Sequence, residues 1–242
     1  MIEVCRLARR FGSVEAVRDV SFTARDGAVT GLLGPNGAGK STTLRVLYTV
    51  LPADAGTALV DGIDVARDPL AARRAIGVLP HQAGIYPQLT ARENIRYFGE
   101  LQGMRGPALE RRIDELVDEL DLAEFADRRA RGFSQGQRVR TAIARALVHS
   151  PRNVLLDEPT NGLDVMATRA LRELIHRLRD LGHCVLFSSH VMQEVAALCD
   201  SIVVIDHGRV AAAGTPAELV ASAGGGTLEE AFVRLLDPGA AQ

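Results

Sequence analysis

A glycine-rich segment between an apolar run and a helical pattern has the residue types that bind phosphate. Residues 34–41 read Gly-Pro-Asn-Gly-Ala-Gly-Lys-Ser and match G-x-x-x-x-G-K-[ST] at every fixed position. The glycines let successive backbone N–H groups point at phosphate oxygens, and the following helix presents its positive end. Lys40 supplies a compact cation for the β- and γ-phosphates, and the Ser41 hydroxyl suits Mg²⁺. The expected nucleotide-binding residues are Gly34, Pro35, Asn36, Gly37, Ala38, Gly39, Lys40, Ser41 and Thr42.

Lysine is nearly absent from the chain, which makes its single occurrence informative. The sequence has 28 lysine and arginine residues, and Lys40 is the only lysine among them. A planar guanidinium serves well at a surface, whereas a narrow backbone cradle favours a compact charge on a flexible stem. We therefore expect nucleotide turnover to depend on Lys40 and to be impaired when arginine replaces it.

Two acidic residues at the end of an apolar run have the chemistry that bound phosphates require. Residues 153–156 read Asn-Val-Leu-Leu, which is typical of a buried strand, and Asp157 and Glu158 follow directly. Adjacent side chains at a strand end point to opposite sides, so the two carboxylates can do different work. We expect Asp157 to join Ser41 in binding Mg²⁺ and Glu158 to polarise an attacking water.

Turn signals near the start of the chain predict an antiparallel layer. Asp-Gly pairs at 26–27 and 61–62 each separate two short apolar runs, and such pairs favour the tight turns of hairpins. Residues 89–149 instead show helical spacing, with a capping box at Thr90 and Glu93. The elements that carry the candidate site residues are therefore expected to be joined by a largely helical insertion.

The second half of the chain predicts a parallel sheet. Apolar runs at 154–156, 185–187 and 202–205 alternate with helical patterns, as expected for buried strands covered by helices on both faces. The predicted fold class is α/β.

Composition excludes several other classes. The chain has 242 residues and 47% hydrophobic residues, enough for one ordered domain. A net charge of −2 and an aromatic content of 4% provide neither a basic field nor stacking rings for nucleic acid. No run approaches the ~20 apolar residues of a membrane span. The three cysteines are widely separated, which indicates free thiols, and the six histidines show no zinc-ligand spacing.

The sequence resembles the ATP-binding subunits of ABC transporters over nearly its whole length. Residues 133–137 read F-S-Q-G-Q, similar to the family's L-S-G-G-Q signature, and Ser134 is a natural N-cap for the helical pattern that follows. The resemblance implies a P-loop NTPase with a RecA-like parallel sheet core, an N-terminal antiparallel β layer and an inserted α-helical signature subdomain. It implies a single domain, 1–242, with an ATP-binding core at 1–86 and 150–222, a helical subdomain at 87–149 and a short C-terminal tail helix at 223–242.

The resemblance also assigns roles to single residues. In this family the signature contacts the γ-phosphate held by a partner subunit, a loop acid lies at the dimer interface and a switch histidine contacts the γ-phosphate. An aromatic residue near the N-terminus stacks on adenine, with an aliphatic residue packed nearby. The matching residues are Ser134, Gly136 and Gln137 for the signature, Asp164 for the loop acid, His190 for the switch, and Phe11 with Val17 for adenine.

Two positions depart from the family pattern. Gln135 replaces the first glycine of the signature, which leaves the local backbone geometry open. The family places a metal-binding glutamine directly after a proline, but here His81 follows Pro80 and the glutamine comes next, as Gln82. Either Gln82 fills the nucleotide and Mg²⁺ role through a shifted loop, which is the interpretation we adopt, or that contact is weaker or absent.

The function implied by the resemblance is ATP hydrolysis, with Mg²⁺, at two composite sites of a head-to-tail homodimer. Lys40, Glu158 and His190 carry the catalysis. The dimer would drive a separate integral membrane permease and would lie in the cytoplasm, peripheral at the inner face of the cell membrane. Residues 77–94 and 227–232 resemble ATPases of sodium-extrusion-type and ABC-2-type exporters, which implies export. The alternative is a non-transport ABC ATPase acting on nucleic acid or the translation machinery. The near-neutral charge and the single phosphate loop disfavour that alternative.

Overall fold

The computed structural model describes residues 1–82 and 84–236, and the strands of these residues form one ten-stranded sheet. The strand order is β5-β4-β1-β2-β10-β9-β3-β8-β7-β6. Strands β9, β3, β8, β7 and β6 are parallel neighbours, which confirms the predicted parallel core, and β2, β1, β4 and β5 form an antiparallel layer. The strands are β1 Ile2–Phe11, β2 Val14–Ala24, β3 Ala28–Leu33, β4 Ala55–Val60, β5 Ile63–Asp64, β6 Ile76–Leu79, β7 Asn153–Asp157, β8 Cys184–Ser189, β9 Ser201–Asp206 and β10 Arg209–Gly214.

One of the two predicted hairpins is confirmed and the other is wrong. The Asp61-Gly62 turn joins β4 to β5 in an antiparallel pair. Asp26-Gly27 also forms a turn, but β2 pairs with β1 and β10, whereas β3 pairs with β8 and β9. Five of the six residues of β3 are buried, so this strand belongs inside a sheet covered on both faces. The Gly27 N–H donates to Gly182 O and His183 O, in the segment before β8. The turn at Asp26-Gly27 thus carries the chain from the antiparallel layer, which contains β2, to the parallel core, which contains β3.

Helices cover both faces of the parallel strands, and the side chains of those strands alternate between two cores. Along β7, Val154 and Leu156 join the cluster under α5 (Gln135–Leu147) and α6 (Val165–Asp180), whereas Leu155 joins the cluster under α1 (Lys40–Leu47). This period of two is the geometry of an extended strand. The helices are α1 Lys40–Leu47, α2 Pro69–Ala75, α3 Ala91–Leu101, α4 Gly106–Glu119, α5 Gln135–Leu147, α6 Val165–Asp180, α7 Met192–Leu198, α8 Pro216–Ser222 and α9 Leu228–Leu236.

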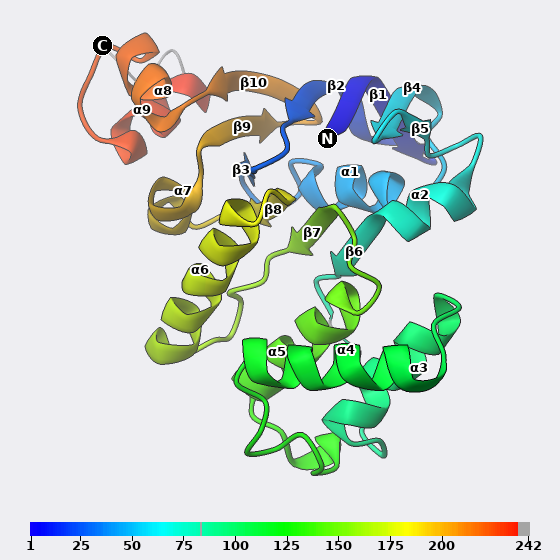
Figure 1. Cartoon of the computed structure of the whole chain (residues 1–242). Coiled ribbons are helices and arrows are strands. Elements are labelled where there is room, and N and C mark those ends of the chain that lie inside the picture. Colours follow the sequence, from blue (N-terminus) through cyan, green and yellow to red (C-terminus); the bar gives the residue numbers. More distant parts are fainter. Residues whose placement is uncertain (83, 237–242) are drawn as a thin grey trace.

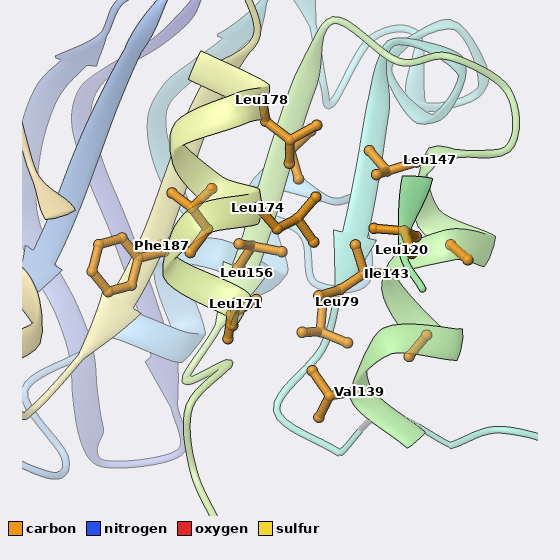
Figure 2. Packing of buried hydrophobic residues seen from close by; sticks show 14 of the residues in the cluster. Leu79, Leu120, Val139, Ile143, Leu147, Leu156, Leu171, Leu174, Leu178 and Phe187 are labelled. Carbon is orange, nitrogen blue, oxygen red and sulfur yellow. The ribbon is translucent and has the colours of Figure 1, made fainter. Parts of the chain in front are cut away.

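Helices α3, α4 and α5 form a group that stands beyond the end of the sheet (Figure 1). The predicted capping box of Thr90 and Glu93 starts α3. Asn94 is fully buried, accepts from Tyr86 N–H at 2.8 Å and donates to Tyr86 O at 3.1 Å, so it ties the segment after β6 to α3. Figure 2 shows how the group joins the core: Ile143 and Leu147 of α5 lie with Leu174 of α6 in one apolar cluster.

The register of the parallel strands brings their carboxyl ends to one edge. Leu156 of β7 lies opposite Leu79 of β6 and Phe187 of β8, and Ser189 of β8 lies opposite Leu33 of β3. The residues that follow these strands, which include the phosphate loop and the two acids, are thereby gathered along that edge. Ligands of open α/β sheets bind at this edge.

The described part of the chain ends in two short helices, α8 and α9, beside β10. The expected tail segment contains α9, and residues 237–242 of that segment lie outside the described part of the chain. No helix in the described ranges is both long enough and apolar enough to cross a membrane.

Candidate functional site

The phosphate loop, residues 34–41, connects β3 to α1 and has little room for side chains. Gly39 is the N-cap of α1 at φ +109°, and a Cβ there would lie 2.5 Å from Ala16 O. A Cβ on Gly34 would lie 2.1 Å from Ile205 O. Only glycine avoids both clashes, so the pattern that predicted a phosphate cradle also fits the packing of the loop. Ala38 is buried, Ser41 and Thr42 are half-buried, and the tip of the loop is exposed at Pro35, Asn36 and Gly37.

Lys40 lies folded into this loop. Its side chain is buried, and its Nζ donates to Gly34 O at 2.7 Å and to Pro35 O at 3.0 Å. Burial lowers the pKa of Lys40, while the nearby charges of Glu158 and Asp157 oppose that shift. The loop therefore holds a desolvated cation between its own carbonyl groups, at the place where the sequence motif puts phosphate oxygens.

Asp157 at the end of β7 has one satisfied and one free oxygen. Its Oδ1 accepts from Ser41 Oγ at 2.9 Å and from Ser188 Oγ at 2.6 Å. Its Oδ2 is buried and has no hydrogen-bond partner among residues 1–82 and 84–236. A buried carboxylate oxygen beside a serine hydroxyl fits a hard cation such as Mg²⁺, which prefers oxygen ligands. The fit covers Ser41 and Asp157, the two metal ligands expected from their motifs.

Glu158 has a strained backbone and an enclosed side chain. Its φ is +49°, a conformation that costs a non-glycine residue about 1 kcal/mol or more. Its N–H donates to Ser188 Oγ at 3.0 Å. The side chain is 12% exposed, with Oε1 at 3.3 Å from Nδ1 of His190 and Oε2 at 3.5 Å from Nδ1 of His81. The expected switch histidine therefore lies beside the expected water-activating acid.

The signature residues 133–137 form the start of α5. Ser134 Oγ accepts from Gln137 N–H at 3.3 Å, and Gln137 Oε1 accepts from Ser134 N–H at 3.0 Å, which completes a capping box. Gln135, in place of the family's glycine, is compatible with this geometry because it is simply the first residue of the helix. Ser134 is exposed, Gly136 is half-buried, and Gln137 uses its side chain in the cap.

The loop after Glu158 adjoins the signature. A Cβ on Gly162 would lie 3.8 Å from Gln135 Cγ, so the two segments are neighbours. Asp164 is the N-cap of α6, and its Oδ1 accepts from Ala167 N–H at 2.8 Å. This cap is a structural task that the resemblance alone does not reveal.

Sequence reasoning missed two polar residues that organise the site. Ser188 joins both acids, as described above. Glu194 of α7 is buried and accepts from Thr160 Oγ1 at 2.6 Å and from Ser189 Oγ at 3.1 Å. It thus links the loop after Glu158 to the strand end before His190. A serine at the end of a buried strand was the available signal for Ser188, whereas the burial of Glu194 depends on packing that the pattern of α7 does not contain.

The remaining candidates, Phe11, Val17 and Gln82, make no hydrogen bond to the phosphate loop or to the two acids among the hydrogen bonds of the described residues. Phe11, at the end of β1, is 43% exposed and Arg9 Cζ lies 4.9 Å from its ring centroid, whereas Val17 is buried. A Cβ on Gly39 would lie 3.5 Å from Val17 Cγ2, which places Val17 against the phosphate loop. Gln82 is exposed and, together with His81 and Glu158, lines a cavity of about 300 Å³.

A phosphate loop after β3, an inner strand of a parallel sheet, and two acids at the end of β7, which is separated from β3 by β8, define a P-loop nucleoside triphosphatase. Comparisons with known proteins narrow this class. The family model described as ABC transporter matches residues 17–161. The ABC transporter ATP-binding protein NatA of Bacillus subtilis (strain 168) is 44% identical over 215 residues, which cover 87% of each chain. The lipopolysaccharide export system ATP-binding protein LptB of Escherichia coli (strain K12) is 36% identical over 217 residues, 88% of this chain and 90% of that one.

A solved structure extends the likeness to the whole fold. The dimeric post-hydrolysis state of the ATP-binding cassette MJ0796, bound to ADP and Pi, aligns with a TM-score of 0.80 and 27% identity, over 89% of this chain and 98% of that one. The chain belongs to the ABC transporter family. It is an ATP-hydrolysing, ATP-binding subunit of that family.

Proposed function

We propose that this chain hydrolyses ATP at sites shared between two copies of itself and thereby drives export through a separate membrane permease. One observation supports the shared site above all. The Ser134 turn is exposed, and no hydrogen bond among the described residues joins it to the phosphate loop of the same chain. A second helix N-terminus that is free to meet phosphate is useful when it reaches the nucleotide of another copy.

In this proposal, each candidate residue of the site has one role in binding or hydrolysing ATP. Lys40 and the amides of the phosphate loop bind the phosphates, and Phe11, supported by Val17, stacks on adenine. Ser41 and Asp157 hold Mg²⁺, which when bound offsets the phosphate charge; Gln82 is the further ligand proposed for it. Glu158 accepts a proton from the attacking water, and His190 stabilises the γ-phosphate.

The signature residues Ser134, Gly136 and Gln137 of the second copy close the site over the γ-phosphate. Asp164 carries the loop at the dimer interface and shapes it by capping α6. Closure excludes bulk water, though not the attacking water, and strengthens the charged contacts made to the phosphates.

The surface that suits a permease lies on α3 and the segment before it. Tyr86, Tyr97 and Leu101 are 45%, 39% and 64% exposed, and the rings of Tyr86 and Tyr97 lie 5.2 Å apart. We call Tyr86, Tyr97 and Leu101 together the α3 patch. Exposed apolar side chains that cluster in this way mark interaction sites. The α3 patch favours an attachment to a permease at the inner face of the cell membrane. The likeness to LptB, an ATP-binding protein of a lipopolysaccharide export system, supports export as the direction of transport.

Co-purification tests this proposal. The tagged chain, recovered from detergent-solubilised membranes of its native cells, should bring down an integral membrane protein in a fixed ratio. Leu101→Glu should abolish the association while the ATPase rate of the isolated chain stays unchanged. Leu181, the residue just after α6, is also an exposed leucine, so Leu181→Glu is the matched control and should retain the partner. Recovery with ribosomes or nucleic acid and without a membrane protein would refute the export function.

A further inference from the structure

His81 lies where the sheet register places a side chain against Glu158. Strands β6 and β7 pair in parallel with Leu79 opposite Leu156, so two residues further along each chain His81 comes level with Glu158. The Nδ1 of His81 lies 3.5 Å from Glu158 Oε2. Across the sheet, Nδ1 of His190 lies 3.3 Å from Oε1 of the same carboxylate. Each oxygen of Glu158 therefore faces one imidazole, and the two rings come from the segments that follow β6 and β8, the strands on either side of β7.

The surroundings leave Glu158 few other restraints. Its backbone is held in the left-handed region, and its side chain borders the cavity of about 300 Å³ that Gln135 and Arg138 of α5 also line. A carboxylate at the edge of a cavity can rotate unless both of its oxygens are held. His190 restrains one oxygen only, and His81 is the group that faces the other.

We propose that His81 is a positioning residue that fixes the carboxylate plane of Glu158 for water activation. The inference rests on the proposed role of Glu158 in hydrolysis. Misplacing a reacting group by about 1 Å costs up to a hundredfold in rate, so a second anchor on the carboxylate has a measurable effect. His81 belongs to the pre-organised geometry of the acid and acts on turnover, whereas binding of the nucleotide depends on the phosphate loop.

The test compares three variants of the purified chain. His81→Ala should lower kcat on the order of ten- to a hundredfold, with KM and the equilibrium Kd for ATP within about twofold of the parent protein. His81→Asn keeps an N–H donor close to the position of Nδ1 and should recover most of the rate. His207→Ala removes an exposed histidine in the turn between β9 and β10 and should leave kcat unchanged.

A double-mutant cycle identifies the group through which His81 acts. In single-turnover assays, adding His81→Ala to Glu158→Gln should cause no further loss, because the carboxylate that His81 orients is already gone. Additive losses, a raised KM at constant kcat, or full activity of His81→Ala would each overturn the inference. Normal hydrolysis by Glu158→Gln alone would instead refute the role proposed for Glu158, so the two failures are distinguishable.

Discussion

Glu158→Gln lowers the rate of ATP hydrolysis by at least about a hundredfold and leaves ATP binding intact. The amide cannot accept a proton from water, so the step that Glu158 assists is lost. Nucleotide affinity should be retained because the substitution leaves Lys40 and the amides of the phosphate loop, the groups proposed to bind the phosphates, untouched. Release of phosphate and equilibrium binding of ATP, measured on the same preparation, separate the two effects.

Glu173→Gln is the matched control for this experiment. Glu173 is an exposed acid on α6 that pairs with Arg169 at 3.2 Å, so its replacement makes the same chemical change far from the carboxyl edge of the sheet. Its rate of hydrolysis should equal that of the parent protein. Undiminished turnover by Glu158→Gln would mean that another group activates the water.

Lys40→Arg weakens ATP binding by about 1.5–3 kcal/mol, the range of a hydrogen bond to a charged group, or about ten- to a hundredfold in Kd. The substitution keeps the charge but not the shape. Lys40 is 4% exposed and enclosed between Gly34 O and Pro35 O, and a planar guanidinium is too wide for that space without moving the loop. Isothermal titration with ATP measures the change.

Arg45→Lys provides the converse control on the same helix. Arg45 is exposed, so exchanging one cation for the other there should alter neither binding nor turnover. Equal affinities for Lys40→Arg and the parent protein would show that the phosphate loop requires charge alone.

Local chemistry was the most predictable part of the site. The phosphate loop could be predicted from the spacing of its glycines and Lys40, and Lys40 contacts Gly34 O and Pro35 O within the loop itself. The close approach of Gly34 to Ile205 and of Gly39 to Ala16 could be seen only in the structure. The acids after β7 follow from their place at the end of an apolar run. Ser134 was predicted from the sequence to be the N-cap of α5. That the side chain of Gln137 completes a capping box with it was seen only in the structure.

Features that depend on pairing between distant strands could not be predicted in the same way. The turn at 26–27 looks like a hairpin, and only the burial of β3 on both faces shows that β2 and β3 belong to different layers. The position of His81 beside Glu158 depends on the register of β6 against β7, strands that are far apart in the sequence. The sequence showed that His81 stands where the family has glutamine, but its contact with Glu158 could be seen only in the structure.

The central claim is that a second copy completes each ATP site, and sedimentation of the Glu158→Gln protein tests it most directly. With saturating ATP and Mg²⁺, this variant should sediment with the mass of two chains, and with ADP as one. Ser134→Arg, added to the same protein, should prevent pairing because it places a bulky cation at the exposed start of α5, whereas Ser222→Arg on α8 should permit it. A single-chain mass for Glu158→Gln with ATP bound would contradict the account.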